Sequence, residues 1–306
     1  MQSGGIEHSQ EAPISASARP ALAPSCLVWG VLNVTPDSFS DGGVCLEPAA
    51  AVAHAQALIE QGASVIDIGG ASSRPKGAAY GQGAMALSAT EELERVAPVV
   101  RAVSALGVPI SIDTTQAEVA RAALALGASI VNDVSCAASG ELLAVTAAAG
   151  AAYVVMHNRG KGEVAPPNTR YADVCADVQA ELLRGVERAK AAGIAAERIW
   201  IDPGVGFAKT PAQSLVLLAR LERLVALGYP VLVGASRKGF IAEVAPRADG
   251  TIPAPLEREA GSLAVLTAAV LKGARAVRVH QVAEARQAVL VAEALMRAGK
   301  GVAHAQ

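Results

Sequence analysis

The chain contains 306 residues, of which 52% are hydrophobic and only 3% aromatic, and its formal net charge is −2. This length is large for an ordinary single domain but suits one α/β barrel with insertions. Charges of both signs are spread along the chain without a Lys/Arg block, which argues against a nucleic acid partner. No window has the length of an uncharged membrane helix, so we expect no membrane partner.

The cysteines and the termini suggest a reducing compartment. The four cysteines show neither CxxC spacing nor a secreted framework, so we expect free thiols in a cytoplasmic protein. Residues 1–24 lack the apolar core of a signal peptide and are expected to form a disordered N-terminal extension. One domain, 25–298, would then follow, and 299–306 would form a flexible C-terminal tail.

From Cys26 onward one unit recurs: a short β-branched run, a polar residue, a Gly/Pro/Ser loop and an alanine-rich helix. The predicted strands are Leu27–Leu32, Ser64–Ile66, Val108–Ile112, Ser129–Val131, Ala152–Met156, Ile199–Ile201, Pro230–Val233 and Ala276–Val279. The predicted helices lie near Pro48–Gln61, Ala89–Leu106, Ala117–Leu126, Glu141–Ala149, Ala172–Ala192, Ala212–Leu227, Glu257–Lys272 and Val282–Arg297. Several of these helices stop at a glycine, the usual left-handed C-cap.

Eight strand–helix units predict a fold of the α/β class, a single-domain (β/α)8 TIM barrel with parallel strands. The alternative is an open doubly wound sheet. That fold predicts a G-x-G-x-x-G fingerprint after the first strand, and the sequence has none there. The barrel is therefore the favoured prediction.

A polar residue follows or ends each predicted strand. In a barrel these strand ends all lie on one face, where the βα loops build the active site. Eight polar ends on one face therefore predict a functional site, made by Asn33, Asp67, Asp113, Asn132–Asp133, His157, Asp202, Ser236 and His280.

The segment from Arg198 to Lys209 shows this design most fully. A short apolar strand stops at Asp202-Pro203-Gly204, because proline cannot donate to a ladder. By itself such a segment is equally typical of a turn with an aspartate helix cap. The repetition of polar strand ends along the whole chain favours a binding site.

The most specific motifs lie in the loops, in the segments Leu32–Gly43, Asp67–Pro75, Ile112–Thr114, Val131–Asp133, Asp202–Lys209, Ala235–Lys238 and Arg278–His280. Taken together, these motifs closely resemble those of the dihydropteroate synthase family of the folate pathway. The resemblance covers roughly residues 27–297.

The resemblance implies that pyrophosphate is displaced from 6-hydroxymethyl-7,8-dihydropterin pyrophosphate by the amine of p-aminobenzoate. The residue chemistry agrees, since a pterin presents N–H donors that need buried acceptors and a pyrophosphate needs cations. We expect the pterin to be bound by Asp113, Asn132, Asp202 and Lys238. The pyrophosphate would be bound by Asn33, Ser73, Arg74, Arg278 and His280. The p-aminobenzoate would contact Phe39, Ser73, Pro75, Phe207, Ser236 and Lys238.

The resemblance also assigns catalytic roles, a metal and an assembly. Asp113, Lys238 and Arg278 are the expected catalytic residues. Asn33 resembles the family position that ligates Mg²⁺, a hard cation that takes oxygen ligands. A homodimer is implied, although from the residues alone a core role is the favoured interpretation of the apolar faces of Ala264–Leu271 and Ala288–Leu295.

The second loop departs from the family pattern, which usually reads Gly-Glu-Ser-Thr-Arg-Pro-Gly. Here Ala71 replaces the glutamate, Ser73 replaces the threonine, Lys76 follows the proline, and Gly77–Ser88 is longer than usual. Arg247–Pro255 is also long. Because sulfonamides imitate p-aminobenzoate but extend further, an altered rim suggests an active synthase that confers sulfonamide resistance. The alternative is ordinary drift in a surface loop.

Three other functions are alternatives to this one. A methyltetrahydrofolate-type methyltransferase shares the pterin carboxylates but needs no pyrophosphate clamp, so Lys238, Arg278 and His280 argue against it. A non-catalytic pterin-binding protein would be expected to lack Asp113 or Asn33. A sugar-phosphate barrel would carry a Gly-rich phosphate loop after the seventh strand, which Gly234–Lys238 mimics only weakly.

Overall fold

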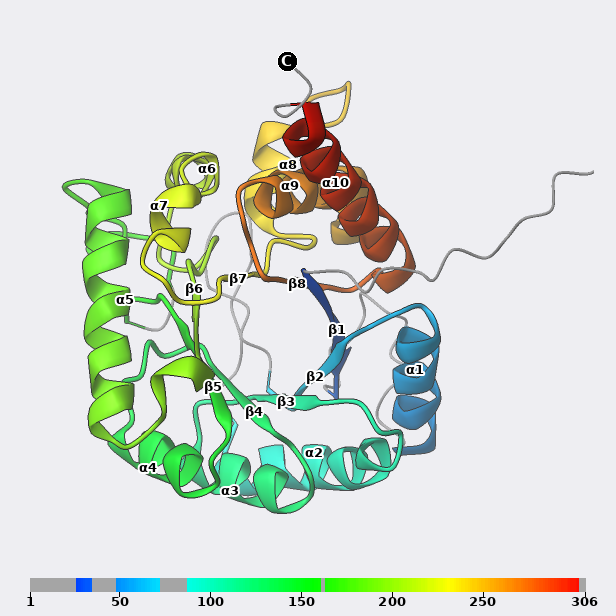
Figure 1. The fold of residues 1–306 in the computed structure, drawn as a ribbon, viewed down its shortest axis with the longest axis vertical. Helices are drawn as coiled ribbons and strands as arrows, with labels where there is room; N and C mark the ends of the chain where they lie inside the picture. The colour runs from blue at the N-terminus through cyan, green and yellow to red at the C-terminus, as the bar shows by residue number, and fades with distance from the viewer. Residues whose placement is uncertain (1–25, 35–47, 72–86, 161–162, 303–306) are drawn as a thin grey trace, which may run out of the picture.

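The computed structural model describes residues 26–34, 48–71, 87–160 and 163–302. Eight parallel strands form a ring that helices surround (Figure 1). The strands are β1 (Leu27–Asn33), β2 (Val65–Gly69), β3 (Ile110–Asp113), β4 (Ile130–Asp133), β5 (Ala152–Met156), β6 (Ile199–Asp202), β7 (Leu232–Val233) and β8 (Ala276–Val279). The predicted (β/α)8 TIM barrel is thereby confirmed.

The strand order closes the ring. Hydrogen-bonded neighbours run β6-β5-β4-β3-β2-β1-β8-β7, so β1 lies beside β8. Between β6 and β7 only an isolated parallel bridge, Ile201 to Val231, completes the circle. The barrel is therefore nearly closed, and the carboxyl ends of all eight strands open on one face.

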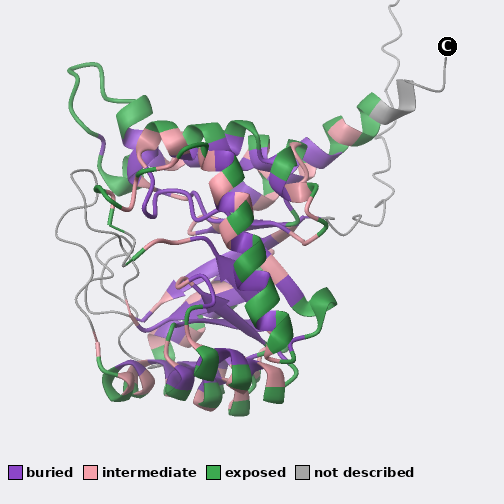
Figure 2. Ribbon diagram, turned by 90° about the vertical axis from the view of Figure 1, so that its left-hand side faces the viewer, coloured by how far each residue is buried: buried purple, intermediate pink, exposed green. Residues whose placement is uncertain are grey.

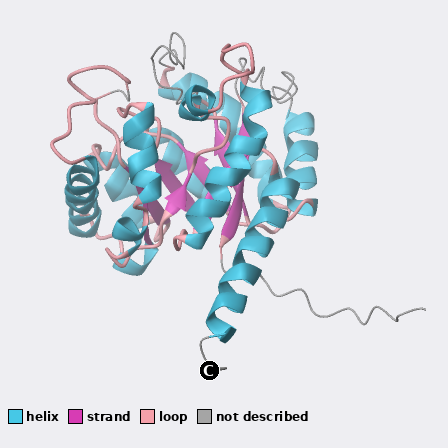
Figure 3. Cartoon of the chain, turned by 90° about the horizontal axis from the view of Figure 1, so that it is seen from above, coloured by secondary structure: helices cyan, strands magenta, loops and turns pink. Residues whose placement is uncertain are grey.

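Helices cover the outside of the ring (Figure 3). Their bounds are α1 (Pro48–Glu60), α2 (Ala89–Ser104), α3 (Ala117–Ala125), α4 (Gly140–Ala148), α5 (Val174–Ala191), α6 (Pro211–Ala219), α7 (Glu222–Val225), α8 (Gly239–Val244), α9 (Glu259–Leu271) and α10 (Val282–Val302). Two short 3-10 helices span Ala196–Arg198 and Pro255–Arg258. Across the described residues, no helix combines the length and apolar character needed to cross a bilayer.

Three helical features differ from the prediction. The single helix expected over Ala212–Leu227 is divided into α6 and α7, and the short helix α8 was not predicted. The last helix extends to Val302, past the expected end at Arg297 and into the segment from residue 299 that was predicted to be a tail. The expected N-terminal extension, 1–24, lies outside the described residues.

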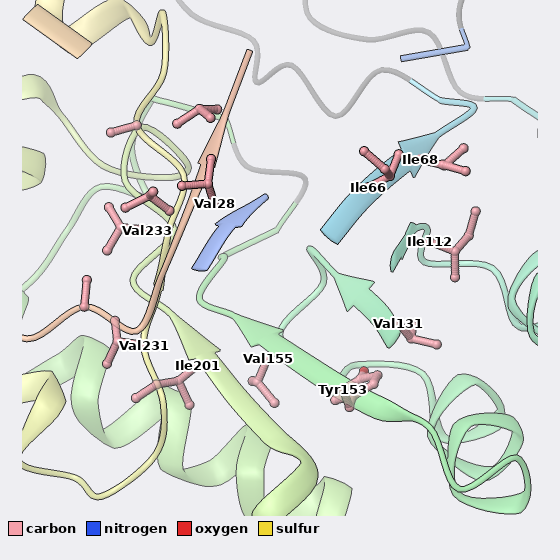
Figure 4. Packing of buried hydrophobic residues seen from close by; sticks show 14 of the residues in the cluster. Val28, Ile66, Ile68, Ile112, Val131, Tyr153, Val155, Ile201, Val231 and Val233 are labelled. Carbon is pink, nitrogen blue, oxygen red and sulfur yellow. The ribbon is translucent and has the colours of Figure 1, made fainter. Parts of the chain in front are cut away.

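Strand side chains alternate between two cores, as the twofold repeat of a β-strand requires. One set points outward and packs against the helices, and Figure 4 shows members of it such as Val28, Ile66, Ile112 and Val131. The other set fills the barrel interior and consists of Trp29, Val65, Ile130, Val154, Leu232 and Ala276. Figure 2 shows that buried residues occupy the sheet and the inner faces of the helices.

The interior core lies near the amino ends of the strands, and this position locates the site. The residue two places after each interior residue also points inward, one step nearer the carboxyl ends. On β2, β4 and β8 these next residues are Asp67, Asn132 and Arg278, which follow Val65, Ile130 and Ala276. The apolar plug is thus succeeded by a polar layer.

Candidate active site

Five inward-facing polar side chains lie at the carboxyl end of the barrel. Asp67, Asp113, Asn132 and Asp202 are buried, and the side chain of Arg278 is 21% exposed. Each comes from a different strand: β2, β3, β4, β6 and β8. The layer holds three carboxyl groups and one guanidinium, so it can accept hydrogen bonds from a ligand that presents several N–H groups.

Arg278 joins two of these carboxylates. Its Nε donates to Asp67 Oδ2 at 2.5 Å, and its Nη2 donates to Asp113 Oδ2 at 2.9 Å. The Nδ2 of Asn132 donates to the same Asp67 oxygen at 3.4 Å. Hydrogen bonds between charged partners are among the strongest in proteins. Asp67 therefore fixes the orientation of both Arg278 and Asn132.

Asp202 and Lys238 occupy the β6–β7 side. Asp202 Oδ1 accepts a hydrogen bond from the Gly204 N–H at 2.6 Å. The ammonium of Lys238 donates to the carbonyl of Val205 at 2.7 Å and lies 4.6 Å from the centroid of the Phe207 ring. This distance is within the range of a cation–π contact. An aromatic face and a cation are thus presented together.

Burial shifts the pKa values of Asp113, Asp202 and Lys238 toward neutral pH. It raises the pKa of Asp113 to about 7, with Arg278 opposing the shift and Asp67 adding to it. Burial also raises the pKa of Asp202, against the attraction of Lys238. The pKa of Lys238 falls to about 8 because burial outweighs the effect of Asp202. Clustered perturbed groups of this kind are typical of a functional site.

A left-handed turn presents the groups that follow β7. Arg237, between Ser236 and Lys238, has φ = 60°. Its N–H donates to Ser262 Oγ at 2.9 Å, and its carbonyl accepts from Arg258 at 2.9 Å, so α9 and the preceding 3-10 helix hold the turn. Ser236 Oγ in turn lies 3.0 Å from Nδ1 of His280, which follows β8.

Comparison with known proteins places the chain. Residues 29–280 match the family described as pterin binding enzyme. The dihydropteroate synthase of Mycobacterium leprae is 46% identical over 283 residues, which cover 91% of this chain and 96% of that protein. The chain belongs to the dihydropteroate synthase family.

Solved dihydropteroate synthases share the fold. That of Xanthomonas albilineans with 4-aminobenzoic acid has a TM-score of 0.79 and 42% identity, covering 89% of this chain and 93% of that one. The same organism's enzyme in complex with 7,8-dihydropteroate has a TM-score of 0.76 and 40% identity, covering 89% and 94%. Each similarity therefore covers most of both chains.

The structure brings most of the predicted binding residues together at the carboxyl end of the barrel. Asn132 and Arg278 both donate to Asp67, and Arg278 also donates to Asp113. The Lys238 ammonium lies over the Phe207 ring, and the Ser236 hydroxyl is within hydrogen-bond distance of His280. Asp202 is the last residue of β6. Asn33 is the half-buried last residue of β1, in register with Gly69. Phe39, Ser73, Arg74 and Pro75 lie outside the described residues.

Three polar residues near strand ends proved to have other surroundings. β2 continues to Gly69, so Asp67 is an interior residue of the strand, and it was given no binding role. Asp133 follows inward-facing Asn132 and must face outward, where it accepts from the Tyr153 hydroxyl at 2.6 Å and the Ala137 N–H at 2.7 Å. His157 is fully buried against Lys209 and Glu181. Side chains alternate between the two faces of a strand, so counting every second residue from the apolar ones would have placed Asp67 inside the barrel and Asp133 outside it.

Proposed function

We propose that this protein is a dihydropteroate synthase. It joins 6-hydroxymethyl-7,8-dihydropterin pyrophosphate to p-aminobenzoate and releases 7,8-dihydropteroate and pyrophosphate. The observation that carries the proposal is the buried layer of acceptors crossed by Arg278, beside the cation–aromatic pair of Lys238 and Phe207, in a chain of this family.

The pterin is bound by the inward-facing layer. Its N–H groups donate to Asp113, Asn132 and Asp202. These side chains are buried, and a buried acceptor without a hydrogen-bond donor costs free energy. The Lys238 ammonium lies on the same side as Asp202 and donates to an acceptor atom of the ring. The acceptors come from different strands, so they fix the orientation of the ring within the barrel mouth.

The reaction exchanges one bond to the pterin methylene carbon for another. The C–O bond to the pyrophosphate breaks and its electron pair leaves with the pyrophosphate. The amine nitrogen of p-aminobenzoate forms the new C–N bond and then releases a proton. Positive charge develops on the pterin as the leaving group departs, and the Asp113 carboxylate stabilises that charge.

The departing pyrophosphate is bound by cations and hydrogen-bond donors. Arg278 and His280 lie at the carboxyl end of β8 and supply them within the described structure. Ser73 and Arg74, from the second loop, are assigned to the same role by the family motif. A planar guanidinium matches phosphate oxygens with paired donors, which makes Arg278 the principal contact.

Mg²⁺ is proposed as the cofactor, with Asn33 as its protein ligand. Among the residues that the structure describes, no three acidic, histidine or cysteine side chains are grouped to hold a metal ion. One amide oxygen at the barrel mouth suits an ion that takes most of its ligands from phosphates and water. When bound, the ion neutralises charge on the pyrophosphate.

The p-aminobenzoate lies toward β6 and β7. The Phe207 ring provides an apolar face for the benzoate, and Lys238 and Ser236 donate to its carboxylate. Phe39, Ser73 and Pro75 complete this side by the family motif. Binding the ring next to the methylene carbon supplies the orientation that the C–N bond requires.

Reduced sensitivity to sulfonamides is proposed as a property of this synthase. The support is the altered second loop, in which Ala71 and Ser73 replace the family's glutamate and threonine and extra residues follow Pro75. The residues that decide the matter, 72–86, lie outside the described structure. Sulfamethoxazole inhibition should be compared with that of an Ala71→Glu, Ser73→Thr variant carrying the short family connection. Equal inhibition of both proteins would remove the resistance hypothesis.

We also propose a cytoplasmic homodimer. Cys26, Cys136 and Cys175 are free and buried, as expected in a reducing compartment. Cell fractionation tests the location, and an enzyme found outside the cytoplasm would contradict it. The dimer is argued from the exposed apolar residues of α9 and α10, discussed below.

The function is tested by mixing the protein with Mg²⁺, the pterin pyrophosphate and p-aminobenzoate. We expect dihydropteroate, identified by mass, and pyrophosphate in equal amounts, with dihydropteroate absent when p-aminobenzoate is omitted. A folded protein that makes no dihydropteroate would contradict the proposal. The same protein incubated with methyltetrahydrofolate and a corrinoid tests the methyltransferase alternative.

A further inference from the structure

The β6–α6 loop, residues 203–210, connects three groups of the proposed site. Asp202 precedes it and accepts from its Gly204 N–H. Its Val205 carbonyl accepts from Lys238, and its Phe207 ring lies beside the same ammonium. The shape of this loop therefore sets the positions of groups that face the pterin and groups that face the benzoate.

Lys209 holds the loop from inside. Its side chain is fully buried, and its Nζ donates to the carbonyls of Gly204 at 3.0 Å and Phe207 at 2.9 Å. The third contact of Nζ is Nδ1 of His157, at 2.8 Å. A lysine ammonium has three donors, and here each has an acceptor. One cation thus fastens two points of the loop to the end of β5.

His157 passes this attachment on to α5. Its Nε2 lies 3.0 Å from Glu181 Oε2, and Glu181 also forms a salt bridge with Arg159. Burial lowers the pKa of His157 to about 4 and that of Lys209 to about 7, so the proton shared by this pair resides on Lys209. His157 is then neutral, accepting through Nδ1 and donating from Nε2 to the Glu181 carboxylate.

A second connection reaches the same loop. The Tyr171 hydroxyl donates to the carbonyl of Ala208 at 3.0 Å, and the Arg159 guanidinium lies 3.8 Å above the Tyr171 ring. Gly204 has φ = 60°, Gly206 has φ = 81° and Ala208 has φ = 50°, so the loop takes left-handed backbone at three positions. Such conformations persist where the surroundings hold them in place.

Burying an ammonium is expensive even when it is paired, and apolar replacements are often as stable or more so. Stability is therefore a weak reason for a buried lysine here. We propose that Lys209 is a positioning residue for both substrates, which holds Asp202, Phe207 and, through Val205, Lys238 in the geometry that binds them. This inference rests on the proposed synthase activity.

The test is the kinetics of Lys209→Met, which keeps the unbranched stem and removes the donors. We expect KM for the pterin pyrophosphate and for p-aminobenzoate to rise by about tenfold or more, with kcat changed by less than about threefold, because binding geometry is lost while Asp113 is kept. The control is Lys272→Met, which removes a surface lysine paired with Glu222. Activity of the unmodified protein tests the synthase function separately.

Two further measurements keep the inference falsifiable if Lys209→Met does not fold. Tyr171→Phe removes only the hydroxyl that binds Ala208 and should raise KM for p-aminobenzoate by about threefold. In the unmodified protein, ¹⁵N NMR should show His157 with a proton on Nε2 and none on Nδ1. Normal KM values in folded Lys209→Met, or in Tyr171→Phe where the first variant is unfolded, would overturn the inference, as would a proton on Nδ1.

Discussion

Arg278 contacts two buried carboxylates, and this arrangement defines what each group in the mouth can do. Asp67 and Asp113 partly neutralise the guanidinium. A pyrophosphate carries more negative charge than either partner, so it competes strongly for the same donors. We infer that Asp67, which was not assigned a role from the sequence, keeps the guanidinium in place during this proposed exchange.

Arg278→Ala should weaken binding of the pterin pyrophosphate at least about tenfold more than binding of the pterin without phosphates, since we propose the guanidinium as the principal phosphate contact. Titration calorimetry with both ligands measures the difference. Arg121→Ala, which removes an exposed arginine paired with Glu141, serves as the control. Equal losses for the two ligands would show that Arg278 does not contact phosphate.

The pH dependence of the reaction should report Asp113. Burial raises its pKa to about 7, so the group is largely protonated below that pH and ionised above it. In the proposed mechanism only the ionised carboxylate stabilises the pterin cation, so kcat/KM for the pterin pyrophosphate should fall as pH decreases through this range. Asp113→Asn should lack this acidic limb. A limb that persists unchanged in the variant belongs to another group or to the substrate.

At the level of elements, strand alternation could be anticipated from the sequence more fully than the loops. All eight strands were predicted within a few residues, because short β-branched runs bounded by glycine and proline are a strong local signal. The extension of β2 past Asp67 was not anticipated. Its buried aspartate is paired with Arg278, 211 residues away, and with Asn132, 65 residues away. A contact of that separation leaves no local pattern.

The helical differences have a similar cause. No proline or glycine separates α6 from α7, and the junction contains Leu221, a fully buried residue of the outer core. The break therefore has no local signal in the sequence. The proposed positioning role of Lys209 could not be predicted from the sequence, because its partner His157 lies in another βα unit. The family motif places four binding residues, Phe39, Ser73, Arg74 and Pro75, in the segments 35–47 and 72–86. These segments lie outside the described structure, so the roles of the four residues stay predictions.

The close approach of β5 and the β6–α6 loop gives a stability prediction. A Cβ on Gly204, which has φ = 60°, would lie 1.9 Å from the backbone carbonyl oxygen of His157. Gly204→Ala should lower the free energy of unfolding by more than about 3 kcal/mol, beyond the usual range for point substitutions. Urea denaturation provides the measurement.

The matched control for that variant is Gly228→Ala. Gly228 has φ = 84°, but a Cβ there would have no neighbour within 4 Å. Only the left-handed backbone penalises alanine at this position, at about 1–2 kcal/mol. If the two variants lose equal stability, the contact between His157 and the β6–α6 loop is not tight in the folded protein.

For the whole molecule, the exposed apolar residues of the last two helices suggest how copies associate. Leu271 at the end of α9 is 45% exposed, and Val291 and Leu295 on α10 are 55% and 58% exposed. Val291 and Leu295 are four residues apart and so share one face of the helix. The sequence left these faces open to either a core or an interface, and their exposure supports the proposed homodimer.

Sedimentation equilibrium should therefore give twice the chain mass for the unmodified protein and a lower mass for Leu295→Asp, because a buried carboxylate at an interface is costly. Glu187→Asp, a change on the exposed part of α5, provides a control. A monomer at all concentrations, or a dimer unaffected by Leu295→Asp, would exclude this interface.

The central claim is that the inward-facing layer of the barrel carries out pyrophosphate displacement, with Asp113 stabilising the charge that develops on the pterin. The most direct measurement is the turnover of Asp113→Asn beside its affinity for the pterin. We expect pterin binding to remain measurable while turnover falls at least about 10²-fold, the scale of losing one preorganised charge-stabilising group. Near-normal turnover in a folded Asp113→Asn protein would contradict the claim.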